Sequence, residues 1–338
     1  MSRTPIPVVL VAGFLGAGKT TLLNHLLANR EGARIGVVVN DFGQVNIDAL
    51  AVAGQVDTMV SLGNGCLCCA VDATGLDAML ARLADAGIDV IVVEASGIAE
   101  PRDLIRLMIA SENPDIRYGG LVEVVDAAEF EAARERHPEL ADHLRVADIV
   151  VLNKADRVTA EAIAKLTSTI EELAPGIPLL TTSHGRVDPR LFFDPEPRGE
   201  RAGQLSFDDL REDDHDHSEH LHAAYQTVTF TAEIPLAPRK FVELLEHRPP
   251  GLFRLKGHAD FGPNGPKSRF GLHTVGGFVQ LDRTAWPADR PRRTELVLIG
   301  AGIDVDALMA ALEACRAEDP DIADEHGMLH ILRYLPQD

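Results

Sequence analysis

A glycine-rich segment near the start of the chain has the residue types and spacing of a phosphate-binding loop. Residues 13–21 read GFLGAGKTT and match the pattern G-x-x-x-x-G-K-T. Backbone N–H groups of such a loop surround phosphate oxygens, and the helix that follows adds partial positive charge. We expect Lys19 to bridge the β- and γ-phosphates and the Thr20 hydroxyl to bind Mg2+. The predicted nucleotide contacts here are Gly13, Gly16, Ala17, Gly18, Lys19, Thr20 and Thr21.

A second motif predicts which base the nucleotide carries. Asn153, Lys154 and Asp156 form an N-K-x-D sequence directly after the apolar residues 147–152. An Asp carboxylate at this place accepts hydrogen bonds from guanine N1–H and the exocyclic amine, donors that adenine does not present there. The alternative is an ordinary polar turn, in which Asn and Asp are common. Behind a phosphate-binding loop, the motif favours a guanine nucleotide.

Two further polar segments follow predicted strands and complete the candidate catalytic set of Lys19, Glu94 and Asp41. Residues 89–97 read DVIVVEASG, so that Glu94 would hold Mg2+ directly or through water and the Gly97 N–H would meet the γ-phosphate. Residues 40–44 read NDFGQ and fit a switch loop that is ordered by γ-phosphate and Mg2+. Asp41 is there a candidate ligand for Mg2+ or for a transferable metal. The alternative for Glu94 is a solvated strand end, and the alternative for residues 40–44 is an ordinary polar loop.

Three thiols lie within four residues, at Cys66, Cys68 and Cys69, in the sequence GCLCC. Such thiolates can converge on one ion and favour Zn2+, Cu+ or Co2+ over hard cations. They leave a fourth position for water, Asp41 or a histidine, which makes an open site that can release its metal. Inert buried thiols and a redox switch remain as alternatives. Cys315, on the apolar stripe of the last predicted helix, is expected to be a core residue.

A polar segment further along the chain offers a second group of metal ligands. His215, His217, His220 and His222 alternate with Asp and Glu residues within 213–222. Imidazole and carboxylate groups this close together can trap a transition metal. A charged tether whose histidines bind nothing fits the same pattern.

Hydrophobic patterning predicts the elements that position these groups. Residues 7–12 have the apolar character of a buried parallel strand, and 20–28 place leucines at helical spacing. Further strands are predicted at 34–40, 88–94, 119–125, 147–153 and 177–183, alternating with helices. This alternation predicts an α/β fold, a P-loop NTPase with a doubly wound, mostly parallel sheet, over 1–194. A His/Asp-rich linker is expected at 195–224 and a small α+β domain of order β-α-β-β-β-α at 225–338. In this domain Pro238 is predicted to open a helix and Asp304 to cap another, with strands near 251–260, 272–281 and 295–299.

Composition narrows the function classes. The 338 residues are 46% apolar, enough for a core in each of two domains, and carry a net charge of −20. A charge of this sign disfavours nucleic acids and anionic membranes as partners. We expect no signal peptide and no membrane span, and therefore a cytoplasmic protein. Four cysteines, three of them clustered, do not indicate a disulfide framework.

The motifs together resemble those of the CobW-like GTPases, G-protein metallochaperones with a CxCC motif. The resemblance rests on GFLGAGKTTLLNHLL, NDFGQ, GCLCC, EASGIAEP and NKAD, and continues in 252–257 and 293–300 of the C-terminal domain. It implies a GTPase that uses GTP and Mg2+ and holds Zn2+, or Co2+, at Cys66, Cys68 and Cys69. GTP would load or lock the metal, and hydrolysis would release it to a client metalloenzyme. Whether two copies form a homodimer is left open.

The chain departs from this family in its switch loop, and its cargo is open. The family usually has NEFGE, where this chain has Asp41 and Gln44. Asp41 keeps the charge with a shorter reach, whereas Gln44 lacks a carboxylate. Alternatives to a zinc chaperone are a cobalt chaperone for cobalamin biosynthesis or nitrile hydratase activation, a redox-sensing GTPase, and a small-molecule kinase.

Overall fold

The computed structural model describes residues 5–29, 33–40, 58–62, 73–97, 99–193, 226–265, 267–287, 291–319 and 326–335. The chain divides into two compact units, 1–222 and 223–338, and each is described by itself. The predicted linker 195–224 lies outside the described residues, so its extent stays a prediction.

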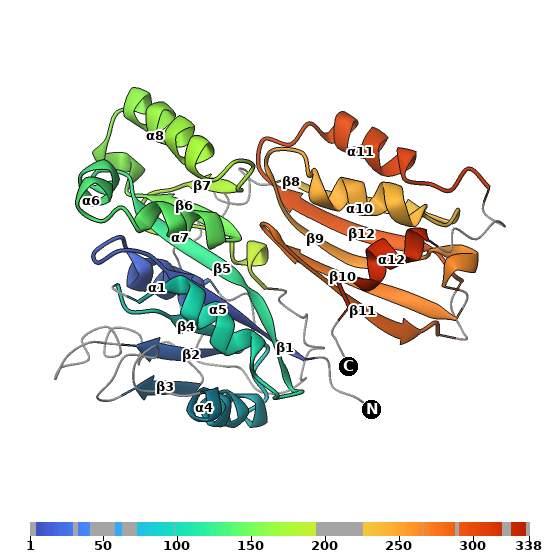
Figure 1. Cartoon of the computed structure of the whole chain (residues 1–338), viewed down its shortest axis with the longest axis horizontal. Helices are drawn as coiled ribbons and strands as arrows, with labels where there is room; N and C mark the ends of the chain where they lie inside the picture. Colours follow the sequence, from blue (N-terminus) through green and yellow to red (C-terminus); the bar gives the residue numbers. More distant parts are fainter. Residues whose placement is uncertain are drawn as a thin grey trace, which may run out of the picture. The chain divides into compact units, whose positions relative to one another are not determined.

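The first unit contains a parallel sheet with the strand order β3-β2-β4-β1-β5-β6-β7 (Figure 1). The strands are β1 (Ile6–Ala12), β2 (Ile35–Asn40), β3 (Thr58–Leu62), β4 (Val90–Glu94), β5 (Ile116–Asp126), β6 (Ile149–Asn153) and β7 (Leu179–Thr181). The chain proceeds from β1 to one side for β2 and β3 and to the other for β5 to β7. Because parallel crossovers are right-handed, this reversal places helices on both faces of the sheet. The predicted α/β fold is confirmed. β3, which was not among the predicted strands, is a short edge strand of mixed polarity.

The helices of this unit cover strands that are buried on both faces. They are α1 (Lys19–Ala28), α4 (Ala73–Asp85), α5 (Pro101–Ile109), α6 (Phe130–Arg136), α7 (Leu140–Val146) and α8 (Ala160–Leu173). Val8 and Leu10 of β1 share a core with Leu104 and Met108 of α5. Leu152 of β6 belongs to a second core with residues of α6, α7 and α8. The central strands are therefore held rigidly, and all of their carboxyl ends lie along one edge.

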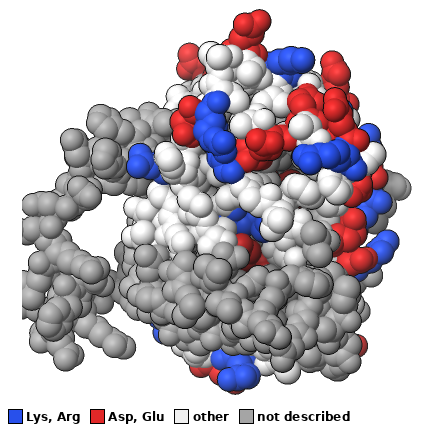
Figure 2. Space-filling view, turned by 90° about the vertical axis from the view of Figure 1, so that its left-hand side faces the viewer, with Lys and Arg blue, Asp and Glu red and all other residues white. Residues whose placement is uncertain are grey.

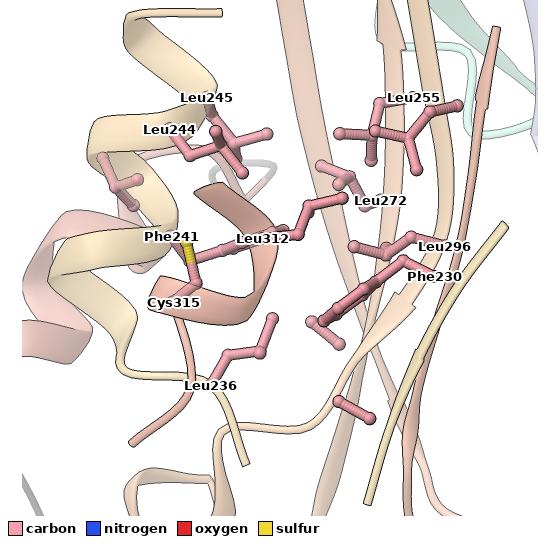
Figure 3. Close-up of a cluster of buried hydrophobic side chains, with 14 of the residues drawn as sticks. Phe230, Leu236, Phe241, Leu244, Leu245, Leu255, Leu272, Leu296, Leu312 and Cys315 are labelled. Carbon is pink, nitrogen blue, oxygen red and sulfur yellow. The ribbon is translucent and has the colours of Figure 1, made fainter. Parts of the chain in front are cut away.

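The described residues of the second unit form an antiparallel sheet with the order β11-β10-β9-β12-β8, together with α-helices. Its elements are β8 (Gln226–Ala232), α10 (Pro238–Glu246), β9 (Leu252–Ala259), β10 (Ser268–Val275), β11 (Phe278–Ala285), β12 (Thr294–Gly300), α11 (Val305–Ala314) and α12 (Gly327–Leu332). As predicted, Pro238 begins a helix and Asp304 caps one, its carboxylate accepting a hydrogen bond from the Ala307 N–H. Figure 3 shows helix side chains such as Phe241 and Leu312 pointing toward sheet residues such as Leu296.

One prediction for this unit is wrong. A single strand was expected near 272–281, whereas the structure has the hairpin of β10 and β11, with Val275 paired to Phe278. Gly276, with φ 52°, and Gly277 form the two-residue turn. Such a turn requires positive φ, which glycine adopts at little cost, so the Gly-Gly pair inside the apolar run was the signal for a hairpin. The short helix α12 was also not predicted.

Cys315, which follows α11, is a core residue as predicted. Its side chain is buried, and its Sγ lies 3.3 Å from the Ala311 carbonyl oxygen and 3.5 Å from that of Lys240. Burial raises the pKa of the Cys315 thiol to about 11. This thiol is therefore neutral and shielded at physiological pH.

We expect Cys315 to resist thiol reagents in the folded protein, because the thiolate is the nucleophile and burial suppresses it. In a variant with Cys66, Cys68 and Cys69 changed to Ser, Cys315 is the sole thiol. Its labelling rate at pH 8 should be at least ~100-fold lower in native buffer than in denaturant. Rates that agree within threefold would contradict the buried position.

Candidate nucleotide and metal site

The P-loop connects β1 to α1 and folds around its own lysine. β1 ends at Ala12, residues 13–18 form the loop, and α1 begins at Lys19. Lys19 Nζ donates hydrogen bonds to the carbonyl oxygens of Gly13, at 2.9 Å, and Phe14, at 3.3 Å. The ammonium group is thus buried and held across the loop. A bound phosphate would draw it away from these two carbonyls.

Two glycines of the loop allow backbone geometry that a side chain would prevent. Gly13 has φ 144°, and a Cβ there would lie 2.3 Å from the Val124 carbonyl oxygen. Gly18 has φ 104°, and a Cβ there would lie 2.3 Å from Asn153 Nδ2. The loop can therefore approach both β5 and β6 closely. This close approach brings the two predicted motifs of the nucleotide site together.

Two of the predicted Mg2+ ligands, Thr20 and Glu94, lie side by side. Thr20 Oγ1 donates a hydrogen bond of 2.9 Å to Oε1 of Glu94, which ends β4 and is 3% exposed. A hydroxyl and a carboxylate oxygen at the start of a P-loop helix are the hard donors that Mg2+ prefers. The donor set therefore fits the ion.

The segment after β4 also contacts the P-loop. A Cβ on Gly97 would lie 2.8 Å from Leu15 Cα and 2.9 Å from Leu15 N, closer than real side chains approach backbone atoms. Glycine at this position lets the two loops touch. The predicted γ-phosphate contact of Gly97 is consistent with this placement.

The N-K-x-D motif joins β6 to the P-loop through two side chains. Asn153 is 1% exposed; its Nδ2 donates to the Ala17 carbonyl oxygen at 3.0 Å, and its Oδ1 accepts from the Gly185 N–H at 3.0 Å. Lys154 Nζ lies 2.6 Å from both the Gly16 carbonyl oxygen and Asp126 Oδ2. The motif residues therefore support the P-loop as well as flank it.

Asp156 stands beside a loop that the sequence analysis missed. Its backbone N–H donates to Ser183 Oγ at 3.1 Å, and its Oδ2 lies 3.9 Å from His184 Nε2. A separate hydrogen bond between the Ser183 side chain and the Asp156 carboxyl holds the pKa of this carboxyl below its ordinary value, so the group is ionised at neutral pH. Ser183 was placed at the end of the strand predicted at 177–183, whereas β7 ends at Thr181; the signal for the loop was the sequence Ser-His-Gly at this end of the strand.

The structure also reveals an acid that was not predicted. Glu123 on β5 is 3% exposed and borders a cavity of about 300 Å3 between the P-loop and β5, α6 and α7. Phe14, Phe130, Leu144, Arg136 and Lys154 are among its other lining residues. Only its pairing with the end of β1 places Glu123 here, so the local sequence gave no signal.

The predicted transition-metal ligands lie outside the described residues. These are Asp41, Cys66, Cys68, Cys69, His215, His217, His220 and His222. Elsewhere, in the parts of the chain that the structure describes, no group of three or more His, Cys, Asp or Glu side chains is arranged to hold a metal ion. The cysteine site therefore stays a prediction.

The carboxyl edge of the first sheet thus gathers the P-loop, the Thr20–Glu94 pair and the N-K-x-D motif. Figure 2 shows this side: Lys, Arg, Asp and Glu residues are concentrated in the upper part, and one small basic area and one small acidic area at the centre lie among uncharged residues. None of the described helices combines the length and apolar character that a membrane crossing requires. A parallel sheet with this loop at its switch point defines a P-loop nucleotide-binding protein.

Comparison with known proteins identifies the family. Residues 7–181 match the CobW/HypB/UreG nucleotide-binding domain, and residues 225–316 match the Cobalamin synthesis protein cobW C-terminal domain. The chain is 32% identical to the zinc chaperone CobW of Pseudomonas aeruginosa, over 92% of each protein. It is 30% identical to the zinc chaperone CobW of a Sinorhizobium species, over 91% of this chain and 97% of that protein. With the zinc chaperone YjiA of Escherichia coli it shares 35% identity over 56% of this chain and 61% of the relative. The chain belongs to the CobW family of GTPases.

We expect the close contact at Gly18 to make it less replaceable than Gly16. Both glycines have a positive φ, so alanine at either position should lower the free energy of unfolding by about 1 kcal/mol. At Gly18 the Cβ would also strike Asn153, whereas among the described residues nothing but the chain neighbours of Gly16 lies within 4 Å of a Cβ placed there. Overpacking should cost Gly18→Ala a further ~1–3 kcal/mol.

Urea denaturation of both variants without nucleotide measures this difference, with Gly16→Ala as the matched control. Equal free energies of unfolding for the two variants would show that the Gly18–Asn153 contact is not tight.

Proposed function

We propose that the chain is a GTP-hydrolysing metallochaperone that carries a transition metal, with zinc as the first candidate, and transfers it to a client metalloenzyme. Cys66, Cys68 and Cys69 would hold the cargo. The observation that carries the proposal is the assembly of two further motifs around the P-loop, through the Thr20–Glu94 and Asn153–Ala17 hydrogen bonds. Its metal-trafficking part is supported by relatives named zinc chaperones that match along more than nine-tenths of the chain.

The P-loop is arranged to bind and activate the triphosphate. Lys19 would leave the carbonyl oxygens of Gly13 and Phe14 and bridge the β- and γ-phosphates. Thr20 and Glu94 would hold Mg2+, which when bound neutralises charge on the phosphate oxygens. Gly97, packed on Leu15, would offer its N–H to the γ-phosphate. The described residues do not supply an evident arginine for the transferring phosphate, and slow turnover, ~10⁻² s⁻¹ or less, is expected.

Guanine recognition would use Asp156 as the acceptor of N1–H and the exocyclic amine. The carboxyl is ionised, and the Asp156 backbone bond to Ser183 fixes the position of the motif. Asn153 anchors the same segment to Gly185, so the loop 183–185 would form the other side of the base site.

The sheet register supports coupling between nucleotide and cargo. Asn40 pairs with Leu62, and Val39 pairs with Glu94, so the ends of β2, β3 and β4 are neighbours. Asp41 follows β2 directly, and the cysteine segment starts four residues after Leu62. The strand ends that precede both predicted metal-binding segments in the sequence are therefore neighbours of the strand that ends at Glu94. A γ-phosphate that orders one of them would change the metal affinity, and reciprocity requires the metal to change GTP affinity by the same factor.

Substitution of Asp156 by Asn should weaken GDP binding about 10- to 100-fold, because guanine loses a charged acceptor worth ~1.5–3 kcal/mol. Xanthosine diphosphate, which carries a carbonyl in place of the amine, should regain affinity for this variant. Fluorescence titration with both nucleotides measures the change. Unaltered GDP affinity would refute the guanine-reading role.

Zinc affinity should rise at least about fivefold when a non-hydrolysable GTP analogue and Mg2+ are bound, the scale of typical allosteric coupling. Competition at buffered free zinc measures this, with Co2+ as the second cargo because raw affinity follows the Irving–Williams order. A Cys66→Ser variant should lose the tight site, whereas the matched control Cys315→Ala should retain it. Identical affinities with and without the analogue would remove the coupling.

A further inference from the structure

A buried acid lies beneath the P-loop without a full set of partners. The backbone of Glu123 pairs with that of Ala12, the last residue before the loop, and its side chain is 3% exposed. Within the described part of the chain, its Oε2 is buried and accepts no hydrogen bond. A carboxylate in such a place is costly unless a cation or a proton neutralises it. Glu123 has access to a cation, Lys19, and to protons from solvent.

The partners of Glu123 connect the phosphate-binding lysine to the surface. His143 on α7 places Nδ1 3.9 Å from Glu123 Oε1 and Nε2 3.3 Å from Glu100 Oε2. The Glu100 side chain, just before α5, is 42% exposed, so protons from solvent can reach the buried carboxyl along this chain. Lys19 attracts the ionised form of Glu123, and Glu100 repels it. Further charged residues border the same cavity: Asp126 on β5, Glu129 and Arg136 at α6, Lys154 after β6 and Arg157.

Burial outweighs the attraction of Lys19 and raises the pKa of Glu123 to about 8. The carboxyl is then mostly neutral at pH 7 and mostly ionised above pH 8.5. Its charge therefore changes within an accessible pH range, directly beneath the residue expected to hold the phosphates.

We propose that Glu123 is a positioning residue for Lys19: when ionised it competes with the nucleotide phosphates for the lysine ammonium group, and when protonated it releases that group to them. This inference rests on the proposed phosphate contact of Lys19. A triphosphate that takes Lys19 would leave an ionised Glu123 buried without its cation. Binding to that form therefore draws one proton from solvent onto the Glu123 carboxylate, and Lys19 keeps its charge throughout.

The sign of the pH dependence follows from this linkage. Nucleotide binding favours the protonated acid, so the pKa of Glu123 is higher in the complex than in the free protein. Affinity is then unaffected well below pH 8 and falls as the pH rises through the free-protein value. Glu123→Gln imitates the protonated acid and should abolish this fall.

Calorimetric titration of the full-length protein with a non-hydrolysable GTP analogue and Mg2+ at pH 7.0 and 8.8 tests the proposal. Any effect of pH that is unrelated to Glu123 is shared by the unaltered protein and Glu123→Gln. Between pH 7.0 and 8.8, the factor by which the unaltered protein loses affinity should be about five to seven times the factor for Glu123→Gln. At pH 7.0 the two proteins should agree within about twofold. At pH 8.0, titrations in buffers of different ionisation enthalpy should show about half a proton taken up per nucleotide, and none by Glu123→Gln.

Glu129→Gln is the matched control, because this exposed acid borders the same cavity, and it should retain the pH dependence. Two outcomes would overturn the proposal. One is a pair of parallel pH profiles for the unaltered protein and Glu123→Gln, and the other is a loss of affinity in Glu123→Gln that is equal at both pH values. Lys19→Ala separates the two hypotheses. If it abolishes binding while Glu123→Gln leaves the pH profile unchanged, the phosphate role of Lys19 stands and the role of Glu123 fails.

Discussion

The buried side chain of Asn153 holds together the three segments on which the nucleotide site depends. Through its Nδ2 it bonds to Ala17 in the P-loop, and through its Oδ1 it accepts from Gly185 after β7. Gly18 must lack a side chain for this contact to exist. The amide thus fixes the distance between the phosphate-binding loop and the proposed base site. Fixed geometry of this kind would let one ligand be recognised at both ends without a change in the spacing of the two loops.

The cations of the site are engaged before any ligand arrives. Lys19 bonds to carbonyl oxygens of its own loop, while Lys154 bonds to Gly16 and Asp126. In a chain with a net charge of −20, these local pairs keep positive charge where phosphates would bind. Lys19 bonds to uncharged carbonyl oxygens and attracts Glu123 only when that acid is ionised, whereas Lys154 is held by the Asp126 carboxylate. The first is therefore suited to move toward a ligand and the second to brace the loop.

The sequence predicted the motifs and secondary structure that short spacings encode. It predicted less well the features that depend on contacts between distant segments. The P-loop, the N-K-x-D motif and the alternating strands are each encoded within one continuous stretch, so their types and positions were predictable. The hairpin at Gly276 was misinterpreted because apolar runs on both sides of a two-residue turn resemble one strand. Glu123 and the loop 183–185 gain their importance only from pairing with distant segments. The cysteine and histidine ligands stay predictions, since they lie outside the described residues.

The edge strands of the two sheets bear on how this protein avoids aggregation. An exposed edge strand can recruit a strand from another molecule, and short or charged edges discourage this. β7 ends its side of the parallel sheet with only three residues. β11, an outer strand of the antiparallel sheet, carries exposed Asp282 and Arg283. At these two margins, backbone-to-backbone aggregation is disfavoured, and lasting contact between molecules there would have to use side chains.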